Sequence, residues 1–301
     1  MSAQKRTKQK KPTSPSSGNQ TEASNRSAAG GFRFPTQRIP LIVLFLVITL
    51  GGSSLVLMRG GRSDIKEYTY EIVNEYKHDS TAFTQGLYFD GKYLYESTGS
   101  PRTLGDVPLS TIRITDLEGN IIKKRELDAK HFGEGLAKVN NRLIQLTYKS
   151  RVALVYDLEL NLVEEIPYDW EEGWGLTYDG RHLIVSDGTA KLRFVDPSTF
   201  KTVREVTVRS GNRPLYQINE LEYINNRIYA NVWHDDSIYV IEPAHGFVEA
   251  RINLSGLYPR NQRSHREAVL NGIAVHSENK TLLVTGKLWP KLFEIRLVEK
   301  R

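Results

Sequence analysis

Apolar and polar residues alternate along most of the chain after residue 64, and this pattern predicts β-strands. It comes in five similar copies, each of which predicts a hairpin of two strands. The copies read GLYFDGKYLY from 86, GLAKVNNRLIQL from 135, GLTYDGRHLIV from 175, ELEYINNRIYA from 220 and GIAVHSENKTLLV from 272. In the first four copies we expect two-residue turns at Asp-Gly or Asn-Asn pairs, which tolerate positive φ. These pairs are Asp90-Gly91, Asn140-Asn141, Asp179-Gly180 and Asn225-Asn226.

A third strand follows each hairpin, and the first four copies continue into a fourth, such as IIKKREL from 121. The fifth copy ends after three strands. Residues 67–76 form a strand that belongs to no copy, and we expect it to pair with residues 291–298 and complete the fifth. Copies about 40 to 50 residues apart are typical of propeller blades. The pattern predicts an all-β domain, a five-bladed β-propeller, over residues 67–301.

The N-terminal part predicts a membrane anchor. Residues 39–58 carry no charge and are long enough to cross a bilayer as one transmembrane helix. Residues 1–38 are basic and rich in Ser, Pro and Gly, which favours a disordered cytoplasmic tail. With a linker at 59–66, we expect a single-pass type II membrane protein of the endoplasmic reticulum or Golgi, with its propeller in the lumen. A cleaved signal peptide is the alternative. In the lumen, Asn253 and Asn279 would be candidate glycosylation sites.

Charge and composition narrow the function. The net charge is +6, but residues 1–38 hold eight of the 41 Lys and Arg and one of the 35 acids, which leaves 33 basic and 34 acidic residues. The folded part is therefore near neutral, and we expect no nucleic-acid partner. The chain has no cysteine, which excludes a thiol nucleophile, a disulfide and a Cys-ligated zinc. We expect a monomer.

Chemistry-bearing residues recur at one place in the repeats. The start of each first strand and the end of each second strand should meet at one mouth of the propeller. The residues there are Gln85, Glu134, Tyr148, Trp174, Asp187, Asn219, Glu220, Trp233, Asn271, Lys287 and Trp289. Trp174 could instead be a core residue, the asparagines could cap loop ends, and Lys287 could be solvated. Glu134 stands between two glycines where sister copies carry Gln or Trp, so we expect a chemical role for its carboxyl.

Several motifs resemble the plant-type glutaminyl-peptide cyclotransferases and their bacterial relatives. They are AFTQGL from 82, FGEGLA from 132, EGWGLT from 172, INELEYINNRIYANVW from 218, LNGIAV from 270 and GKLWPKLFEI from 286. The resemblance covers about residues 67–298. It implies a five-bladed propeller that converts N-terminal glutamine of peptides and proteins to pyroglutamate and releases ammonia. It also implies that catalysis requires no cofactor, and that a structural metal ion, Ca²⁺ or Zn²⁺, occupies the central channel.

The resemblance also implies the site residues. Glu134, Lys287 and Asn219 would be catalytic, and Gln85, Trp174 and Trp233 would bind the substrate; none would ligate a metal. Our hypothesis gives Glu134 the proton transfers, Lys287 with Asn219 the oxyanion, and the two tryptophans the orientation of the substrate.

Two other functions remain open at this point. The rim could belong to a lumenal binding scaffold without turnover. Alternatively, Glu134, Glu220, Asn219 and Asn271 could ligate Ca²⁺ in a lactonase-like hydrolase. Ammonia release would separate the cyclotransferase from the scaffold, and sensitivity to chelation would separate it from the hydrolase.

Overall fold

In a computed structural model of the protein, residues 64–101 and 109–300 are described, and all of them belong to the compact unit Met58–Arg301. Three sheets have four strands each, in the order of the chain. The first consists of β2 (Phe83–Phe89), β3 (Leu94–Gly99), β4 (Thr111–Thr115) and β5 (Ile121–Glu126). The second consists of β6 (Gly133–Val139), β7 (Arg142–Thr147), β8 (Val152–Tyr156) and β9 (Leu162–Pro167). The third consists of β10 (Leu176–Tyr178), β11 (Leu183–Ser186), β12 (Lys191–Val195) and β13 (Thr202–Thr207).

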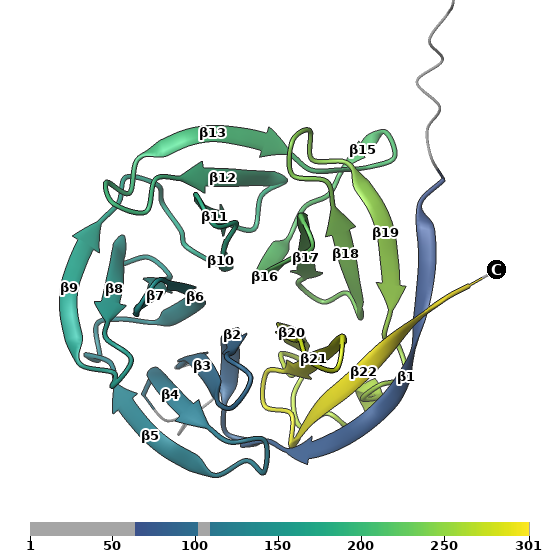
Figure 1. Ribbon diagram of the computed structural model, residues 1–301, viewed down its shortest axis with the longest axis horizontal. Coiled ribbons are helices and arrows are strands. Elements are labelled where there is room, and N and C mark those ends of the chain that lie inside the picture. The colour runs from purple at the N-terminus through teal and green to yellow at the C-terminus, as the bar shows by residue number, and fades with distance from the viewer. Residues whose placement is uncertain (1–63, 102–108, 301) are drawn as a thin grey trace, which may run out of the picture. The chain divides into compact units, whose positions relative to one another are not determined.

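The remaining long strands form one sheet of eight strands, in the order β16-β17-β18-β19-β1-β22-β21-β20. Their bounds are β16 (Ile218–Ile224), β17 (Arg227–Val232), β18 (Ser237–Ile241), β19 (Val248–Asn253), β1 (Lys66–Lys77), β22 (Lys291–Glu299), β21 (Thr281–Gly286) and β20 (Leu270–His276). A small sheet joins β14 (Arg209–Ser210) to β15 (Arg213–Pro214), and η2 (Arg260–Gln262) is a short 3₁₀ helix. Figure 1 shows the strands set around a common centre, with β2, β6, β10, β16 and β20 innermost.

The strand β1 explains why one sheet has eight strands. It pairs antiparallel with β22, from Tyr68 opposite Glu299 to Lys77 opposite Lys291. This confirms the predicted pairing of residues 67–76 with the C-terminal strand. On its other side, β1 pairs in parallel with β19, where Lys66 lies opposite Ala250. The fourth and fifth sequence copies therefore share one continuous sheet.

The predicted fold, a five-bladed propeller preceded by a transmembrane helix, is therefore wrong as stated. The all-β class holds, but the described strands assemble into three four-stranded sheets, one two-stranded sheet and one eight-stranded sheet. The repeats predict the hairpins, whereas the sheet boundaries depend on pairings between outer strands that carry no repeat signal. Within residues 64–101 and 109–300, no helix is long and apolar enough to span a membrane. The predicted tail 1–38 and span 39–58 lie outside the described residues.

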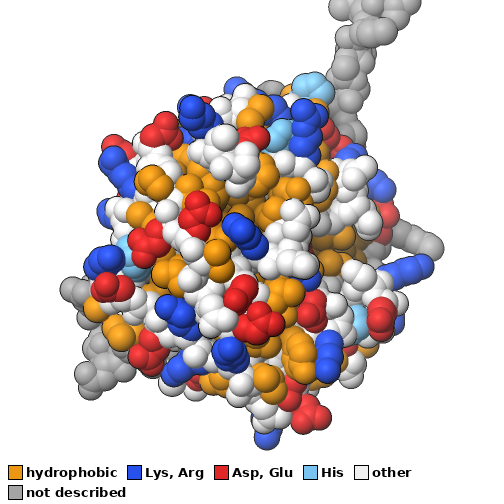
Figure 2. Space-filling view, turned by 60° about the vertical axis from the view of Figure 1, so that its left-hand side comes forward, with side chains coloured by type: hydrophobic (Ala, Val, Ile, Leu, Met, Phe, Trp, Pro, Cys, Tyr) orange, Lys and Arg blue, Asp and Glu red, His pale blue; other side chains and the backbone are white. Residues whose placement is uncertain are grey.

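The hydrophobic core lies between neighbouring sheets. One cluster joins Tyr95 and Ile112 of the first sheet to Leu136 and Leu143 of the second. The inner strands are mostly buried, whereas all six residues of β5 are exposed. Outer strands carry charges that limit further edge pairing, and Lys and Arg mix with Asp and Glu over the face in Figure 2. Because the sheets pack against each other around a common centre, the ends of the inner strands come close together there.

Two kinds of hairpin turn occur. The Asn-Asn pairs form the predicted two-residue turns, since Val139 pairs with Arg142 and Ile224 with Arg227. At Asp90 the predicted position of the turn is wrong by one residue. Strand pairing stops at Phe89 and Leu94, and inside this loop the Asp90 amide donates to the Tyr93 carbonyl at 3.1 Å, so Gly91 and Lys92 are the central residues. The Asp90 carboxylate accepts the amides of Lys92 and Tyr93, which stabilises the loop. The loop after Tyr178 is built in the same way around Asp179.

Candidate active site

A break in strand pairing recurs in the inner strands, and site residues lie at it. The register shifts between Thr84 and Gly86 in β2, between Gly133 and Leu136 in β6, and between Ile218 and Leu221 in β16. These intervals contain Gln85, Glu134 and Asn219. A β-bulge re-aims a side chain and is common beside active sites. The bulges therefore turn these three side chains toward the mouth rather than along the sheet faces.

Trp174 reaches the same mouth from just before β10. Its amide and the carbonyl of Gly175 both bond to Ser186, at 3.0 and 3.1 Å, so two residues oppose one, as in a bulge. A Cβ at Gly175 would collide with the Asn219 carbonyl. The glycine beside Trp174 thus permits close approach of two inner strands, while the indole itself lies in the pocket.

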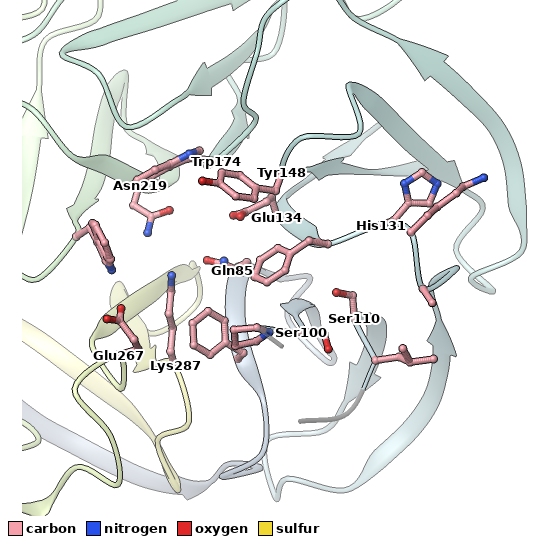
Figure 3. Close-up of a pocket in the computed structure, with 17 residues that line it drawn as sticks. Gln85, Ser100, Ser110, His131, Glu134, Tyr148, Trp174, Asn219, Glu267 and Lys287 are labelled. Atoms are coloured by element: carbon pink, nitrogen blue, oxygen red, sulfur yellow. The ribbon is translucent and has the colours of Figure 1, made fainter. Parts of the chain in front are cut away.

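All six residues implied by the sequence line one cavity of about 590 Å³. Figure 3 shows Gln85, Glu134, Trp174, Asn219 and Lys287 gathered there, with Tyr148, His131 and Glu267 at its sides. Trp233 directly follows β17 and Lys287 directly follows β21. A site of this size, mostly apolar with a few converging polar groups, is typical of small-ligand binding.

Glu134 is buried without full hydrogen bonding. Its side chain is 4% exposed, and its Oε2 atom has no hydrogen-bond partner among the described residues. Burial raises the pKa of this carboxyl well above its usual range, while the Lys287 charge opposes that rise. A carboxyl whose pKa is raised in this way accepts a proton more readily than an exposed glutamate, and it can return that proton to a more basic group.

Lys287 is a buried cation on the same cavity. It is 4% exposed, and its Nζ atom lies 4.8 Å from the centre of the Phe83 ring. Among the described residues, no carboxylate lies within 4.0 Å of this nitrogen. Burial lowers the pKa of Lys287 to about 8, although Glu134 and Glu267 act in the opposite direction. The ammonium is thus available to a ligand in the cavity.

The two amide side chains are held differently. Gln85 is buried, and its Oε1 atom accepts a hydrogen bond from Asn271 Nδ2 at 3.3 Å. Within the described part of the chain, its Nε2 donor group is therefore left for a ligand. Asn271 also donates to the Thr84 carbonyl at 2.9 Å. Asn219 is buried as well, and its Oδ1 atom has no partner in the described part of the chain.

Aromatic rings form the walls of the cavity. Trp174 and Trp233 meet edge to face, with ring centres 6.1 Å apart. The ring centre of Phe132 lies 6.2 Å from that of Phe83 and 5.9 Å from that of Tyr148. The sequence reasoning missed Phe83 and Phe132. Phe83 stands two residues before Gln85, and Phe132 stands two residues before Glu134. Because residues two apart in a strand point to the same face, this spacing could have predicted that both rings lie near the site.

Some rim residues predicted from the repeats do not line the cavity. Glu220 is buried, and its two carboxylate oxygens accept the backbone amides of Leu87, at 3.3 Å, and Ile273, at 3.0 Å. It therefore ties three inner strands together. Asp187 pairs with Arg193 outside the cavity. Asn271 supports Gln85 from behind.

The described residues contain no cluster of side chains that could coordinate the metal ion implied by the resemblance. No group of three or more His, Asp or Glu side chains comes together there. The Glu220 oxygens are occupied by backbone amides, so they do not fit a metal ligand. The structural ion stays a prediction.

Comparisons with known proteins agree with the site. Residues 45–297 match the profile of the glutamine cyclotransferase family. A glutaminyl-peptide cyclotransferase from Arabidopsis thaliana is 42% identical over 232 residues, which cover 75% of this chain and 71% of that protein. The crystal structure of Myxococcus xanthus glutaminyl cyclase is 36% identical, with a TM-score of 0.72, and the match covers 79% of this chain and 100% of that one. The chain belongs to the glutamine cyclotransferase family.

Proposed function

We propose that this enzyme is a glutaminyl-peptide cyclotransferase that closes N-terminal glutamine to pyroglutamate and releases ammonia. The observation that carries the proposal is that one cavity contains both a carboxyl with an unbonded oxygen and a lysine that has no ion-pair partner among the described residues. The family membership and the relatives named above support the same reaction.

The reaction is an internal acyl transfer. The α-nitrogen of glutamine bonds to the carbonyl carbon of its own side-chain amide, and the bond from that carbon to the amide nitrogen breaks. The neutral amine is the nucleophile, so the ammonium form first loses one proton to solvent. As the amine attacks, one further proton must leave the α-nitrogen and one must reach the departing nitrogen. No water is consumed, so a cavity with aromatic walls suits the reaction because it keeps water from the reacting carbon.

Glu134 performs both proton transfers in this proposal. The α-amino group has an ordinary pKa of about 7.7 to 8.0. Because burial raises the pKa of Glu134, its carboxylate is a stronger base than that of an ordinary glutamate, and it accepts the proton that the α-nitrogen loses as it bonds to the carbonyl carbon. The same proton then passes to the leaving nitrogen, and the carboxylate is restored. General acid–base catalysis of this kind contributes about 10² to 10⁴ in rate.

Lys287 stabilises the negative charge that develops on the carbonyl oxygen. Its ammonium is desolvated, so its interaction with an oxyanion is stronger than it would be in water. The Gln85 Nε2 donor faces the same cavity, and the unbonded Asn219 Oδ1 atom can accept a hydrogen from the substrate amine or amide. Trp174 and Trp233 hold the glutamine side chain in its ring-forming conformation.

The geometry does not favour the calcium-dependent hydrolase. That reading required Glu134, Glu220, Asn219 and Asn271 to converge on one ion. Glu220 and Asn271 do not line the cavity and are bonded elsewhere. No observation favours a scaffold without turnover.

The proposed partners are peptides and proteins with an N-terminal glutamine. The membrane anchor, the lumenal location, glycosylation and the monomeric state stay predictions.

For glycosylation, the two candidates differ: Asn279 Nδ2 donates to Glu294 at 2.8 Å, whereas Asn253 uses its oxygen, which accepts the Ser255 amide. We therefore propose Asn253 as the better acceptor, because its amide nitrogen has no such bond to lose.

The decisive test is ammonia release from a glutaminyl peptide, with mass spectrometry of the product. We expect one ammonia per peptide and a product lighter by that mass. The matched control is the same peptide with an acetylated α-amine, which should not react because the nucleophile is blocked. Equal ammonia release from both peptides would identify an amidase and contradict the proposal.

A further inference from the structure

The indole of Trp174 is held by an acid outside the six predicted site residues. Its Nε1 atom donates a hydrogen bond to Glu172 Oε2 at 3.0 Å. The other oxygen of Glu172, Oε1, lies 3.0 Å from the Lys149 ammonium. The Glu172 side chain is 27% exposed and that of Lys149 is 63% exposed. Glu172 thus links the cavity wall to the outer rim.

The other contacts of this indole are apolar. A Cβ at Gly188 would lie 2.7 Å from the six-membered ring, so the ring occupies the space that the glycine leaves open. Trp233 meets the indole edge to face. Such contacts restrict tilting but do not set which way the indole nitrogen points. A hydrogen bond from Nε1 supplies that direction, and buried tryptophan normally has such a partner.

The local sequence explains how the acid reaches the ring. Glu172 and Trp174 are two residues apart in the segment just before β10, and this short separation places the carboxylate within hydrogen-bond reach of the indole nitrogen. Gly173 between them has no space for a Cβ, which would lie 2.8 Å from the Tyr168 hydroxyl. The segment is therefore pressed against the second sheet, and Glu172 is carried beside the indole.

We infer that Glu172 is a positioning residue, which sets the orientation of the Trp174 indole against the bound glutamine side chain. Orienting the indole requires only the acceptor oxygen of Glu172; the charge of Glu172 acts separately, by adding to burial in raising the pKa of the Glu134 carboxyl. Lys149 restrains Glu172 from the solvent side. Exposed ion pairs of this kind contribute little, so losing Lys149 should matter far less than losing Glu172. The inference rests on the proposed function for its kinetic part only.

Three variants test the inference by KM and kcat on a glutaminyl peptide. Glu172→Ala should raise KM up to about tenfold and lower kcat less than threefold, because one hydrogen bond contributes up to about a factor of ten. Glu172→Gln keeps an acceptor for the indole and should stay within about threefold of the wild type. Glu171→Ala, the exposed neighbouring acid, is the matched control and should have no effect. If Glu172→Ala behaves like the control, or Glu172→Gln fails as badly as Glu172→Ala, the inference is wrong.

A second readout does not depend on turnover. The Trp174 indole N–H resonance can be assigned as the one that Trp174→Phe lacks. It should move and exchange faster with solvent in Glu172→Ala, but stay close to the wild-type position in Glu172→Gln. An unmoved resonance in Glu172→Ala would overturn the inference even if the enzyme were active. If the alanine variant does not fold, the glutamine variant decides: its resonance must persist with slow exchange, and its loss would count against the inference. A wild type without ammonia release but with these shifts would reject the proposed function alone.

Discussion

Two buried glutamates of this protein, Glu294 and Glu134, differ in their hydrogen bonding, and their pKa values shift in opposite directions. Glu294 is fully buried at the seam between β1 and β22, and its carboxylate accepts hydrogen bonds from Asn74, Tyr76, Asn279 and Thr281. Although burial opposes this, the four donors lower the pKa of Glu294 to about 2. Glu134 is nearly as buried but has an unbonded oxygen, and burial raises the pKa of its carboxyl.

The difference shows that enough side-chain donors can outweigh burial: four of them lower the pKa of Glu294, whereas burial prevails at Glu134 and raises its pKa. At the seam, complete bonding stabilises one ionised form and one geometry. In the cavity, incomplete bonding favours the protonated carboxyl relative to an exposed glutamate, so Glu134 takes up a proton more readily than an ordinary carboxylate. The seam therefore contributes stability, whereas the cavity holds an unfavourable arrangement that serves the reaction.

The largest effect should come from removing the proton site in the cavity. Glu134→Gln keeps the size of the side chain but cannot carry a proton, so kcat should fall by about 10² or more with little change in KM. Glu222→Gln is the matched control. Glu222 is another buried glutamate, whose pKa burial raises to about 8, but it does not line the cavity. Steady-state kinetics on both variants would contradict our assignment if the two lost activity equally.

Removing the charge at the seam should instead lower stability. A pKa shift from 4.5 to about 2 corresponds to at most about 3 kcal/mol of differential interaction. Because the pKa of Glu294 is lowered on folding, this stability is present above pH 4.5 and is lost as the pH falls toward 2. Glu294→Gln should thus destabilise the protein at pH 7 by up to about 3 kcal/mol, measured by urea unfolding, while kcat of the folded fraction stays unchanged.

The same measurement on Glu134→Gln should have the opposite sign. The pKa of Glu134 is raised on folding, so its contribution is fully present below the unfolded pKa and is lost as the pH rises. Glutamine does not ionise, and the variant should therefore be more stable than the wild type at pH 8 and equal to it near pH 4. A loss of stability at pH 8 would mean that Glu134 is a structural residue.

Lys287 should set the alkaline limit of activity. Its pKa of about 8 means that the ammonium is lost above that pH, and kcat/KM should fall up to tenfold for each further pH unit. Lys287→Arg keeps its charge over the whole range. Whatever its absolute activity, this variant should lose the alkaline fall in the pH profile. An unchanged profile would assign the fall to another group.

The sequence predicted the site better than the fold, and the reason is physical. Site residues stand at one repeated position, so the five hairpins bring Gln85, Glu134 and Asn219 to one mouth. The parallel contact of Lys66 with Ala250 has no such signal, because an edge strand can pair through its backbone with any side chains. The four-residue loop at Asp90 was also unpredictable, since it depends on how the Asp side chain bonds to the backbone.

The smallest effect should come from Asn271. Its hydrogen bonding is intermediate between that of the fully bonded Glu294 and that of the partly bonded Glu134. It bonds to Gln85 Oε1 at 3.3 Å and to the Thr84 carbonyl at 2.9 Å, so it fixes which end of the Gln85 amide faces the cavity. Asn271→Ala should let the amide rotate and present its oxygen to the substrate carbonyl in part of the molecules. We expect KM to rise a few-fold, since a neutral hydrogen bond contributes about 0.5 to 1.5 kcal/mol.

Loss of a buried asparagine also costs stability, so the effect on KM needs a matched control. Asn231 is equally buried, and its Oδ1 atom accepts the Gly272 amide at 2.9 Å, but it does not contact Gln85. Asn231→Ala should lower stability by a similar amount, about 1 kcal/mol, and leave KM unchanged. If both variants raise KM alike, Asn271 acts through the general packing of the inner strands. A rise confined to Asn271→Ala would instead show that one hydrogen bond behind the cavity directs the Gln85 donor into it.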